Sequence, residues 1–303
     1  MPLHTAPDVE RIHRTAPALD APFADVMAGS ARWEIRVHDH GFAALVDSMP
    51  RMVPTLAGQA PTADFAIVQA ARVSYGAGTK KISEDRGLIR YLMRHRHSTP
   101  FEMVEFKFHM AMPIFVARQW IRHRTANVNE YSARYSIVAD RFYHPALEHV
   151  RAQSAGNRQG GAEIASAATA EEFLAYLQRV EEQYADYQRL LEKGVSRELA
   201  RIGLPVSIFT EWYWKCDLHN IFHFLSLRLD EHAQQEIRDY ARAMYALIKP
   251  IVPVACEAFE DYRLNAMHLT ALEIEALRSG RALASDNKRE QAEWDAKRAR
   301  LGV

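Results

Sequence analysis

The segment from residue 121 to residue 136, IRHRTANVNEYSARYS, concentrates side chains that could bind an anion or the edge of a base. Arg122, His123 and Arg124 stand together just past an apolar run, and a polar run follows that contains Asn127, Asn129, Glu130, Ser132 and Arg134. An arginine fork matches the oxygens of a phosphate or the carbonyl of a pyrimidine. Amides and hydroxyls supply neutral donors for a base edge or a sugar. The simpler alternative is a helix C-terminus that carries basic residues, which the helix dipole favours, but the dense polar run favours a binding site.

A second cluster lies in the segment DLHNIFHFLSLRLDEHAQ. Helical spacing places His219 and His223 on one stripe, while Arg228 stands among leucines. An unpaired charge in apolar surroundings costs free energy, so Arg228 requires a partner. That partner could be a carboxylate, Asp230 or Glu231, or it could be an anionic ligand. The H-x-x-x-H spacing also suits metal ligands, but a third ligand and the glutamate of H-E-x-x-H are missing, so no metal site is predicted.

Two further segments are weaker signals. HSTPFE, residues 97–102, combines groups that could line a pocket, and Arg201 stands in ELARIGLP between an expected helix and an expected strand. The patterns G-x-G-x-x-G, G-x-x-x-x-G-K-[ST] and G-x-S-x-G are absent. Cys216 and Cys256 are isolated from every polar cluster. The sequence therefore predicts neither a Rossmann nucleotide site nor an obvious covalent nucleophile.

The elements that must position these clusters fall into groups of strands and groups of helices. Residues 33–37 and 206–216 have the composition of strands, and residues 103–112 alternate apolar and polar side chains. Apolar residues recur at helical spacing elsewhere. The expected helices are 63–76, 84–95, 114–124, 171–194, 196–204, 218–230, 233–250 and 253–262. Segregated strands and helices favour an α+β fold over a doubly wound sheet.

Composition limits the class of protein. The chain has 303 residues, of which 48% are hydrophobic, and its 38 basic and 38 acidic residues give no net charge. It therefore lacks the electrostatic footprint of a general nucleic-acid binder. No run approaches the ~18 apolar residues of a membrane span, and the N-terminus does not resemble a signal peptide. Two isolated cysteines are typical of a reducing compartment, so a cytoplasmic protein is expected.

Three regions are expected along the chain. Residues 1–31 are predicted to form a poorly ordered N-terminal extension, and residues 32–265 a single catalytic domain that contains a variable, small-residue loop at 151–169. Residues 266–303 are predicted to form a polar, helical C-terminal tail.

Taken together, the clusters resemble the flavin-dependent thymidylate synthases. That family is marked by R-H-R, seven residues and then S, which here is Arg122-His123-Arg124, seven residues and Ser132. RQWIRHR, NEYSARYS, HSTPFE, ARIGLP and FHFLSLRLDEHAQQEIR each resemble a family block. The resemblance covers roughly residues 33–263. Five blocks in family order make a chance match implausible.

The resemblance implies an α+β fold with a central, mainly antiparallel sheet flanked by helices. It also implies a homotetramer with active sites shared between subunits, acting on small molecules and not on nucleic acid or membranes. The implied reaction converts dUMP to dTMP with 5,10-methylenetetrahydrofolate as the carbon donor. NADPH would reduce FAD, and the reduced flavin would supply the hydride. The resemblance implies no essential cysteine nucleophile. This is compatible with the isolation of both cysteines from the polar clusters.

The resemblance also implies roles for individual residues. Those matching dUMP positions are Gln119, Trp120, Ile121, Arg122, Glu130, Tyr131, Ser132, Ala133, Arg134, Arg201 and Arg228. Those matching FAD positions are Ser74, His97, Thr99, Glu102, Arg122, His123, Arg124, Asn129, Glu130, Asp217, Leu218, His219, His223 and His232. Arg228 is the expected catalytic residue, because a fixed guanidinium beside N3 of uracil stabilises the developing anion and makes C5 more nucleophilic.

Three positions depart from some members of the family. Asn127 stands where others carry serine, and Asp217 and His219 stand where others carry asparagine and arginine. Two other functions compete with that of a synthase. One is a phosphate- or RNA-binding module that uses the R-H-R segment without chemistry, and the other is a metallohydrolase that uses His219, His223 and His232.

Overall fold

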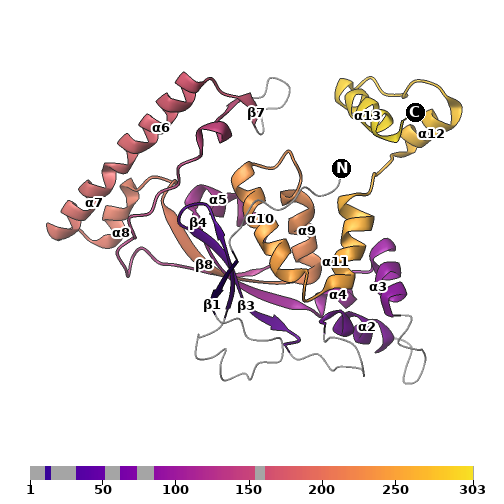
Figure 1. The fold of residues 1–303 in the computed structure, drawn as a ribbon, viewed down its shortest axis with the longest axis horizontal. Helices are drawn as coiled ribbons and strands as arrows, with labels where there is room; N and C mark the ends of the chain where they lie inside the picture. The colour runs from indigo at the N-terminus through magenta and orange to yellow at the C-terminus, as the bar shows by residue number, and fades with distance from the viewer. Residues whose placement is uncertain (1–10, 15–31, 52–61, 74–84, 154–160, 303) are drawn as a thin grey trace. The chain divides into compact units, whose positions relative to one another are not determined.

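The computed structural model describes residues 11–14, 32–51, 62–73, 85–153 and 161–302 (Figure 1). Ser74 lies outside the described residues, as does the expected N-terminal extension apart from Arg11–Arg14. Contacts divide the chain into two compact units, Met1–Cys256 and Glu257–Val303. Each unit is described by itself.

A six-stranded sheet forms the centre of the first unit in the described part of the chain, and every neighbouring pair of strands is antiparallel. Its strands, in spatial order, are β1 (Arg11–Arg14), β2 (Arg32–Val37), β3 (Gly41–Met49), β4 (Glu105–Pro113), β8 (Phe209–Asp217) and β5 (Asn127–Glu130). The predicted strands 33–37, 103–112 and 206–216 are confirmed. β3 and β5 were not predicted, because β3 lacks clean alternation and β5 is a short polar edge strand that depends on pairing with β8.

The two central strands give the sheet one apolar and one polar face. Phe108 of β4 lies opposite Trp214 of β8, and both side chains are buried. The next pair along, His109 and Tyr213, faces the other way, and their rings stack at 4.7 Å. This alternation follows from the two-residue period of a strand. It explains why β4 could be recognised from its sequence.

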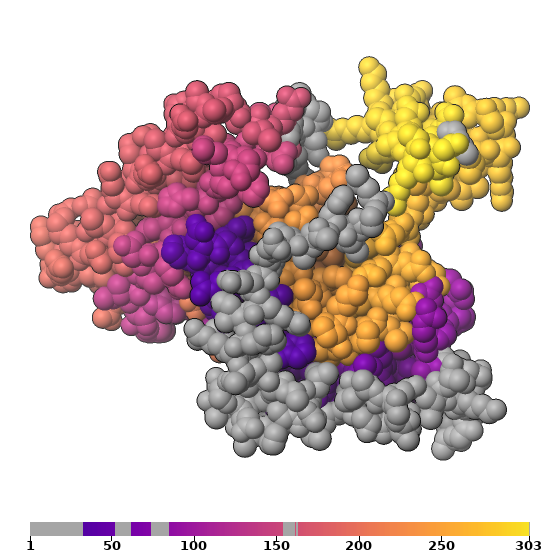
Figure 2. All heavy atoms as spheres, viewed as in Figure 1, coloured from indigo at the N-terminus to yellow at the C-terminus, as the bar shows by residue number. Residues whose placement is uncertain are grey.

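The helices α5 (Ile114–Trp120), α9 (Leu218–Arg228) and α10 (Gln235–Ile248) pack on the sheet. α4 (Thr99–Glu102) packs against α9, and α2 (Asp64–Arg72) packs against α4 and α3 (Asp85–Arg94). α11 (Pro253–Phe259) follows α10 along the chain. α10 packs on β2 and β3, while α9 packs on β8 and against α10 (Figure 1). In the view with all atoms, the orange spheres of this part of the chain form a continuous area of the surface (Figure 2). The architecture is the expected α+β fold with a central antiparallel sheet.

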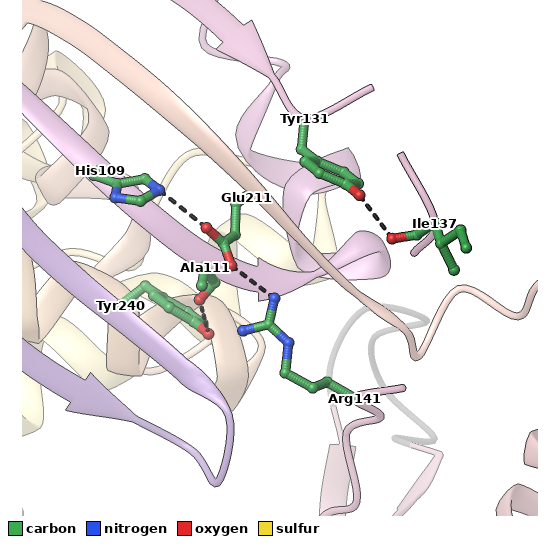
Figure 3. Close-up of polar contacts among 7 residues, drawn as sticks. All are labelled: His109, Ala111, Tyr131, Ile137, Arg141, Glu211 and Tyr240. Atoms are coloured by element: carbon green, nitrogen blue, oxygen red, sulfur yellow. Dashed lines mark hydrogen bonds and ion pairs between the residues drawn. The ribbon is translucent and has the colours of Figure 1, made fainter. Parts of the chain in front are cut away.

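Large aromatic side chains join this helical layer to the sheet. The ring of Trp120, at the end of α5, lies 4.5 Å from Phe224 of α9 and 5.7 Å from Trp214 of β8. Tyr240 of α10 donates a hydrogen bond to the carbonyl oxygen of Ala111 at 2.7 Å (Figure 3). A Cβ at Gly41 would lie 2.1 Å from the Tyr240 hydroxyl, so only glycine allows this close approach.

A second apolar cluster lies between the sheet and the helices that follow β5. Its buried residues are Val138, Phe142, Tyr184, Tyr187, Ala200 and Ile208. The elements in this part of the chain are η3 (Leu147–His149), β6 (Arg151–Gln153), β7 (Gly161–Ile164), α6 (Ala167–Glu181), α7 (Gln183–Glu192), α8 (Arg197–Ala200) and η4 (Arg201–Gly203). Tyr184 and Tyr187 place α7 on this cluster, which therefore supports the segment before α8.

Two predictions for this region were wrong in detail. The single helix predicted over 171–194 is two helices, α6 and α7, which meet at Glu182, and nothing in the residue types marks the break. Gly194 ends the second helix as predicted, with a φ of 86° that glycine adopts at low cost. Part of the segment expected as a loop over 151–169 pairs instead as the two strands β6 and β7.

The second unit, taken by itself, is helical. After the π-helix η5 (Glu260–Leu264) come α12 (Ala271–Ser279) and α13 (Lys288–Leu301). Thr270 and Glu273 form a capping box at the start of α12. Lys297 of α13 donates to the Glu273 carboxylate at 2.7 and 2.9 Å. This partly buried contact joins the two helices.

Candidate functional site

The structure brings the two sequence clusters together at Arg228, in the last turn of α9. Its Nε donates to His123 Nε2 at 3.1 Å, and its NH2 group lies 3.5 Å from the carbonyl oxygen of Gln119. His123 Nε2 must accept this hydrogen bond, so the imidazole is neutral and carries its proton on Nδ1. Burial, and then the charges of Arg228 and His223, lower the pKa of His123 to about 4. His123 is therefore a neutral acceptor that orients the arginine.

Neither carboxylate that might have neutralised Arg228 does so. Asp230 accepts hydrogen bonds from His232 instead, and in the described part of the chain the Glu231 carboxylate forms no ion pair with Arg228. Within the described ranges, Arg228 has no carboxylate partner. The side chain is half-buried, and burial together with the charge of Arg122 lowers its pKa. An uncompensated, partly buried charge is costly, and a bound anion would remove that cost.

The N-terminus of α9 holds the segment after the R-H-R triplet. Asp217 caps the helix by accepting from the backbone N–H of Asn220 at 2.9 Å and from its side-chain amide at 2.7 Å. The Asn220 side chain in turn accepts from the hydroxyl of Thr125 at 2.9 Å. The rings of His123 and His223 are 5.8 Å apart. Asn220 was missed by the sequence analysis, although its place three residues after a capping aspartate is a recognisable signal.

The HSTPFE segment also reaches α9. Thr99 and Glu102 lie at the two ends of α4, which packs against α9, and the rings of Phe101 and Phe222 are 6.5 Å apart. The backbone N–H of Leu218 donates to Val104 just beyond α4, at 2.8 Å. Expected FAD residues from two distant segments therefore lie next to those of α9.

The expected uridylate residues after β5 are held separately. Glu130 accepts from the hydroxyl of Thr210 at 2.8 Å. Ala133 packs against the second apolar cluster, which also contains Ala200. Arg134 and Arg201 each follow one of these alanines, so a single packing cluster supports both arginines.

The loop between Tyr131 and Arg141 is fixed to β8 at both ends. At one end, the backbone N–H of Tyr131 donates to the Glu211 carbonyl oxygen at 2.8 Å, and the Tyr131 hydroxyl donates across the loop to Ile137 at 2.8 Å. At the other, Arg141 donates to the Glu211 carboxylate at 2.6 Å, and His109 donates to the same carboxylate at 3.1 Å (Figure 3). The hydrogen bond from His109, followed by the hydrogen bond and charge of Arg141, lowers the pKa of Glu211 to about 2 against the opposing effect of burial.

This anchor was missed by the sequence analysis. Glu211 lies on a strand whose polar positions read as ordinary solvent-facing residues, and its partners come from distant segments. Because the anchor fixes both ends of the loop, it positions Ser132 and Arg134, which lie between them.

Several expected residues do not join one pocket within a single chain. Asn129 and Glu130 are consecutive in β5, so their side chains point to opposite faces of the sheet. Trp120 and Leu218 are fully buried, so only their backbones could reach a ligand. His232 is exposed and paired with Asp230. Gln119 donates to Gln234.

The residues expected to bind uridylate form two groups. Arg228 and Gln119 belong to one, and Arg134 and Arg201 to the other. No hydrogen bond or ion pair joins the two groups in the part of the chain that the structure describes.

The geometry favours neither a metal site nor a cysteine nucleophile. The described residues contain no group of three or more His, Cys, Asp or Glu side chains that could hold a metal ion. Cys216 and Cys256 are both buried, and neither is in a disulfide. Burial, with the charges of Asp217 and Glu105, raises the pKa of the Cys216 thiol, whose Sγ donates to the Thr125 carbonyl at 3.2 Å.

Among the described helices, none has the length and apolar character needed to cross a membrane.

Comparisons with known proteins agree on one family. A family model described as "Thymidylate synthase complementing protein" matches residues 55–254. The chain is 66% identical over 282 residues to the flavin-dependent thymidylate synthase of Dictyostelium discoideum, covering 93% of this chain and 92% of that protein. It is 54% identical over 271 residues to the protein of the same name from Gluconobacter oxydans, covering 86% of each.

A solved structure is similar as well. The UMP/dUMP methylase PolB from Streptomyces cacaoi, bound with 5-Br UMP, matches with a TM-score of 0.65 and 35% identity, covering 77% of this chain and 99% of that chain. The fold and the site define an α+β protein in which Arg228 has no carboxylate partner among the described residues. With these matches, the chain belongs to the family of flavin-dependent thymidylate synthases.

Proposed function

We propose that this enzyme makes dTMP by reductive methylation of dUMP, with FAD as cofactor, NADPH as reductant and 5,10-methylenetetrahydrofolate as carbon donor. The observation that carries the proposal is that the positive charge of Arg228 is half-buried and is not neutralised by a carboxylate within the described ranges. Its half-buried guanidinium is oriented by His123 and Gln119 but has no carboxylate partner within the described ranges. A structural arginine at this depth would be expected to have one.

Arg228 would act on the uracil ring. A guanidinium beside N3 and its neighbouring carbonyl stabilises the anion that develops there, which raises electron density at C5. Because His123 is neutral, it does not compete with the ligand for the charge of Arg228. Arg134 and Arg201 would bind phosphate oxygens, for which a guanidinium fork is well suited.

The donors around α9 fit an anionic cofactor. Arg122 and Arg124 are exposed and have no carboxylate partner among the described residues, and His219 and His223 lie one helical turn apart on α9. These residues, together with Thr99 and Glu102 from α4, would bind FAD. When bound and reduced, the flavin supplies the hydride for the methylation.

We further propose a homotetramer whose active sites use residues from more than one chain. Two observations support it: the Arg228 group and the Arg134 group do not meet within the described part of one chain, and Asn129 faces away from Glu130. Residues 32–265 would form the catalytic domain, followed by the tail 266–303. Two cysteines that form no disulfide are in keeping with a cytoplasmic location.

The proposed function is tested with purified protein. We expect a yellow protein that oxidises NADPH and that forms dTMP only when dUMP and methylenetetrahydrofolate are both present. A flavin-free protein, or one that oxidises NADPH without forming dTMP, would contradict it. A colourless protein with strongly salt-dependent RNA affinity would instead support the binding-module alternative.

Shared sites are tested by mixing two inactive variants, Arg134→Ala and Arg228→Ala. If one site takes these arginines from different chains, mixed tetramers contain some sites with both, and part of the activity returns. Mass spectrometry of isotope-labelled subunits confirms exchange. Exchange without recovery of dTMP formation would show that both arginines come from the same chain.

A further inference from the structure

A groove lies between the turn after Ser132 and the end of α7. Its volume is about 610 Å³. Ile137, Leu191 and Val195 supply its apolar lining, and the last two also pack against the second apolar cluster. The groove therefore lies on a packed surface, next to the loop that Glu211 anchors.

Two arginines from distant parts of the chain line this groove, and both are positioned through Tyr135. The Arg134 guanidinium lies 5.2 Å from the centroid of the Tyr135 ring, and its Nε donates to the Ser132 hydroxyl at 3.4 Å. Arg197 donates to the Tyr135 carbonyl oxygen at 3.5 Å. The two guanidiniums are therefore held at one turn.

Neither arginine is neutralised in the part of the chain that the structure describes. Glu192 and Glu198 line the same groove, but neither forms an ion pair with Arg134 or Arg197. Like charges that share a site raise its electrostatic free energy, and an anion between them lowers it. Two guanidinium forks match the several oxygens of a phosphate monoester, and the hydroxyl of Ser196 in the same groove adds a donor.

We propose that Arg197 is a further phosphate-binding arginine of the uridylate site, in addition to Arg134 and Arg201, and that it acts with Arg134 on the 5′-phosphate of dUMP. The inference rests on the proposed function, because it takes dUMP as the substrate. Arg197 would add affinity for the phosphate and leave the chemistry at the uracil ring unchanged.

The test compares Arg197→Ala and Arg197→Lys with Arg189→Ala in the flavin-loaded enzyme. Arg189 is a matched control, since it lies on α7, is exposed and pairs with Asp186 outside the groove. Arg197→Ala should raise the Kd for dUMP about 10-fold to 100-fold, the usual loss for one charged hydrogen-bonding group. Arg197→Lys should recover part of this affinity. The control should match the wild type, and kcat at saturating dUMP should change little.

Three further measurements identify the anion. Affinity for deoxyuridine, which lacks the phosphate, should be the same in the wild type and Arg197→Ala, and inorganic phosphate should compete with dUMP less well in the variant. KM values for NADPH and methylenetetrahydrofolate should not change. An unchanged Kd for dUMP, an equal loss with deoxyuridine, or a loss confined to NADPH or the folate would each overturn the proposal. Failure of the proposed function is distinct, because the wild type itself would then lack flavin or dTMP formation.

Discussion

Two clusters in this molecule combine a histidine with an arginine, and they differ in whether a carboxylate neutralises the arginine. On the polar side of the sheet, His109 and Arg141 share the carboxylate of Glu211, whose pKa falls to about 2. At the end of α9, Arg228 donates to His123 and has no carboxylate partner among the described residues. The pKa of His123 falls to about 4. The first cluster is complete within the chain, so it can only build structure. The second retains an uncompensated positive charge and is available to a ligand.

The strongest way to break this comparison is to remove Arg228. Arg228→Ala should lower the rate of dTMP formation by ~10²–10³, the typical loss for one charge-stabilising donor. Melting temperature and flavin content should stay close to wild type, since no ion pair is lost. Arg228→Lys should recover little, because a point charge cannot span N3 and the carbonyl together. Rates come from product assays at saturating dUMP.

Arg141→Ala is the matched control from the complete cluster. It should lower the melting temperature more than Arg228→Ala does. A stable, flavin-loaded Arg228→Ala protein that turns over dUMP normally would remove the catalytic role.

Glu211→Gln tests whether the cluster of Glu211, Arg141 and His109 stabilises the fold. It removes the charge that holds Arg141 and His109, so the free energy of unfolding should fall by about 1–3 kcal/mol at neutral pH. The folded pKa of Glu211, about 2, lies below the unfolded value. Its contribution is therefore present above the unfolded pKa and is lost as pH falls through the folded pKa. Urea unfolding of wild type and variant should show a gap that narrows from pH 5 toward pH 2, and a gap that stays constant would contradict the anchor.

His123 gives a smaller, spectroscopic effect. Its folded pKa lies below the ordinary histidine value, so its contribution to stability is present above that value and is lost as pH falls toward 4. NMR titration should find the imidazole neutral at pH 6 and protonated only near pH 4. Arg228→Ala should raise this pKa only in part, because burial is the largest cause and His223 remains. A histidine that titrates at its ordinary pKa in the wild type would show that the hydrogen bond from Arg228 is absent.

The smallest effect is expected from the thiols, which belong to neither cluster. Cys216→Ala combined with Cys256→Ala should retain substantial dTMP formation, because both side chains are buried and the raised pKa of Cys216 keeps its thiol protonated. Two small cavities should lower the melting temperature modestly. Loss of all activity in a folded double variant would indicate a thiol mechanism.

Local patterns in the sequence were sufficient for much of the fold. The alternation in 103–112 predicted β4, because one face of that strand is buried and the other is polar. The R-H-R motif with Ser132 and the blocks around it indicated the family, which the comparisons confirm. β3 and β5 escaped prediction because their pairing partners, and not their own residues, make them strands.

The partners of the charged residues were decided only by the tertiary structure. The sequence left Arg228 with two possibilities, a neighbouring carboxylate or a ligand, and the fold turned the carboxylates elsewhere while placing His123 against it. In the same way, the anchor at Glu211 and the groove lined by Arg134 and Arg197 bring together segments far apart in the chain. Charge compensation depends on distance in space, which residue spacing along a chain does not specify. The sequence therefore determined which groups the site could use, and the fold determined which of them remain free to act.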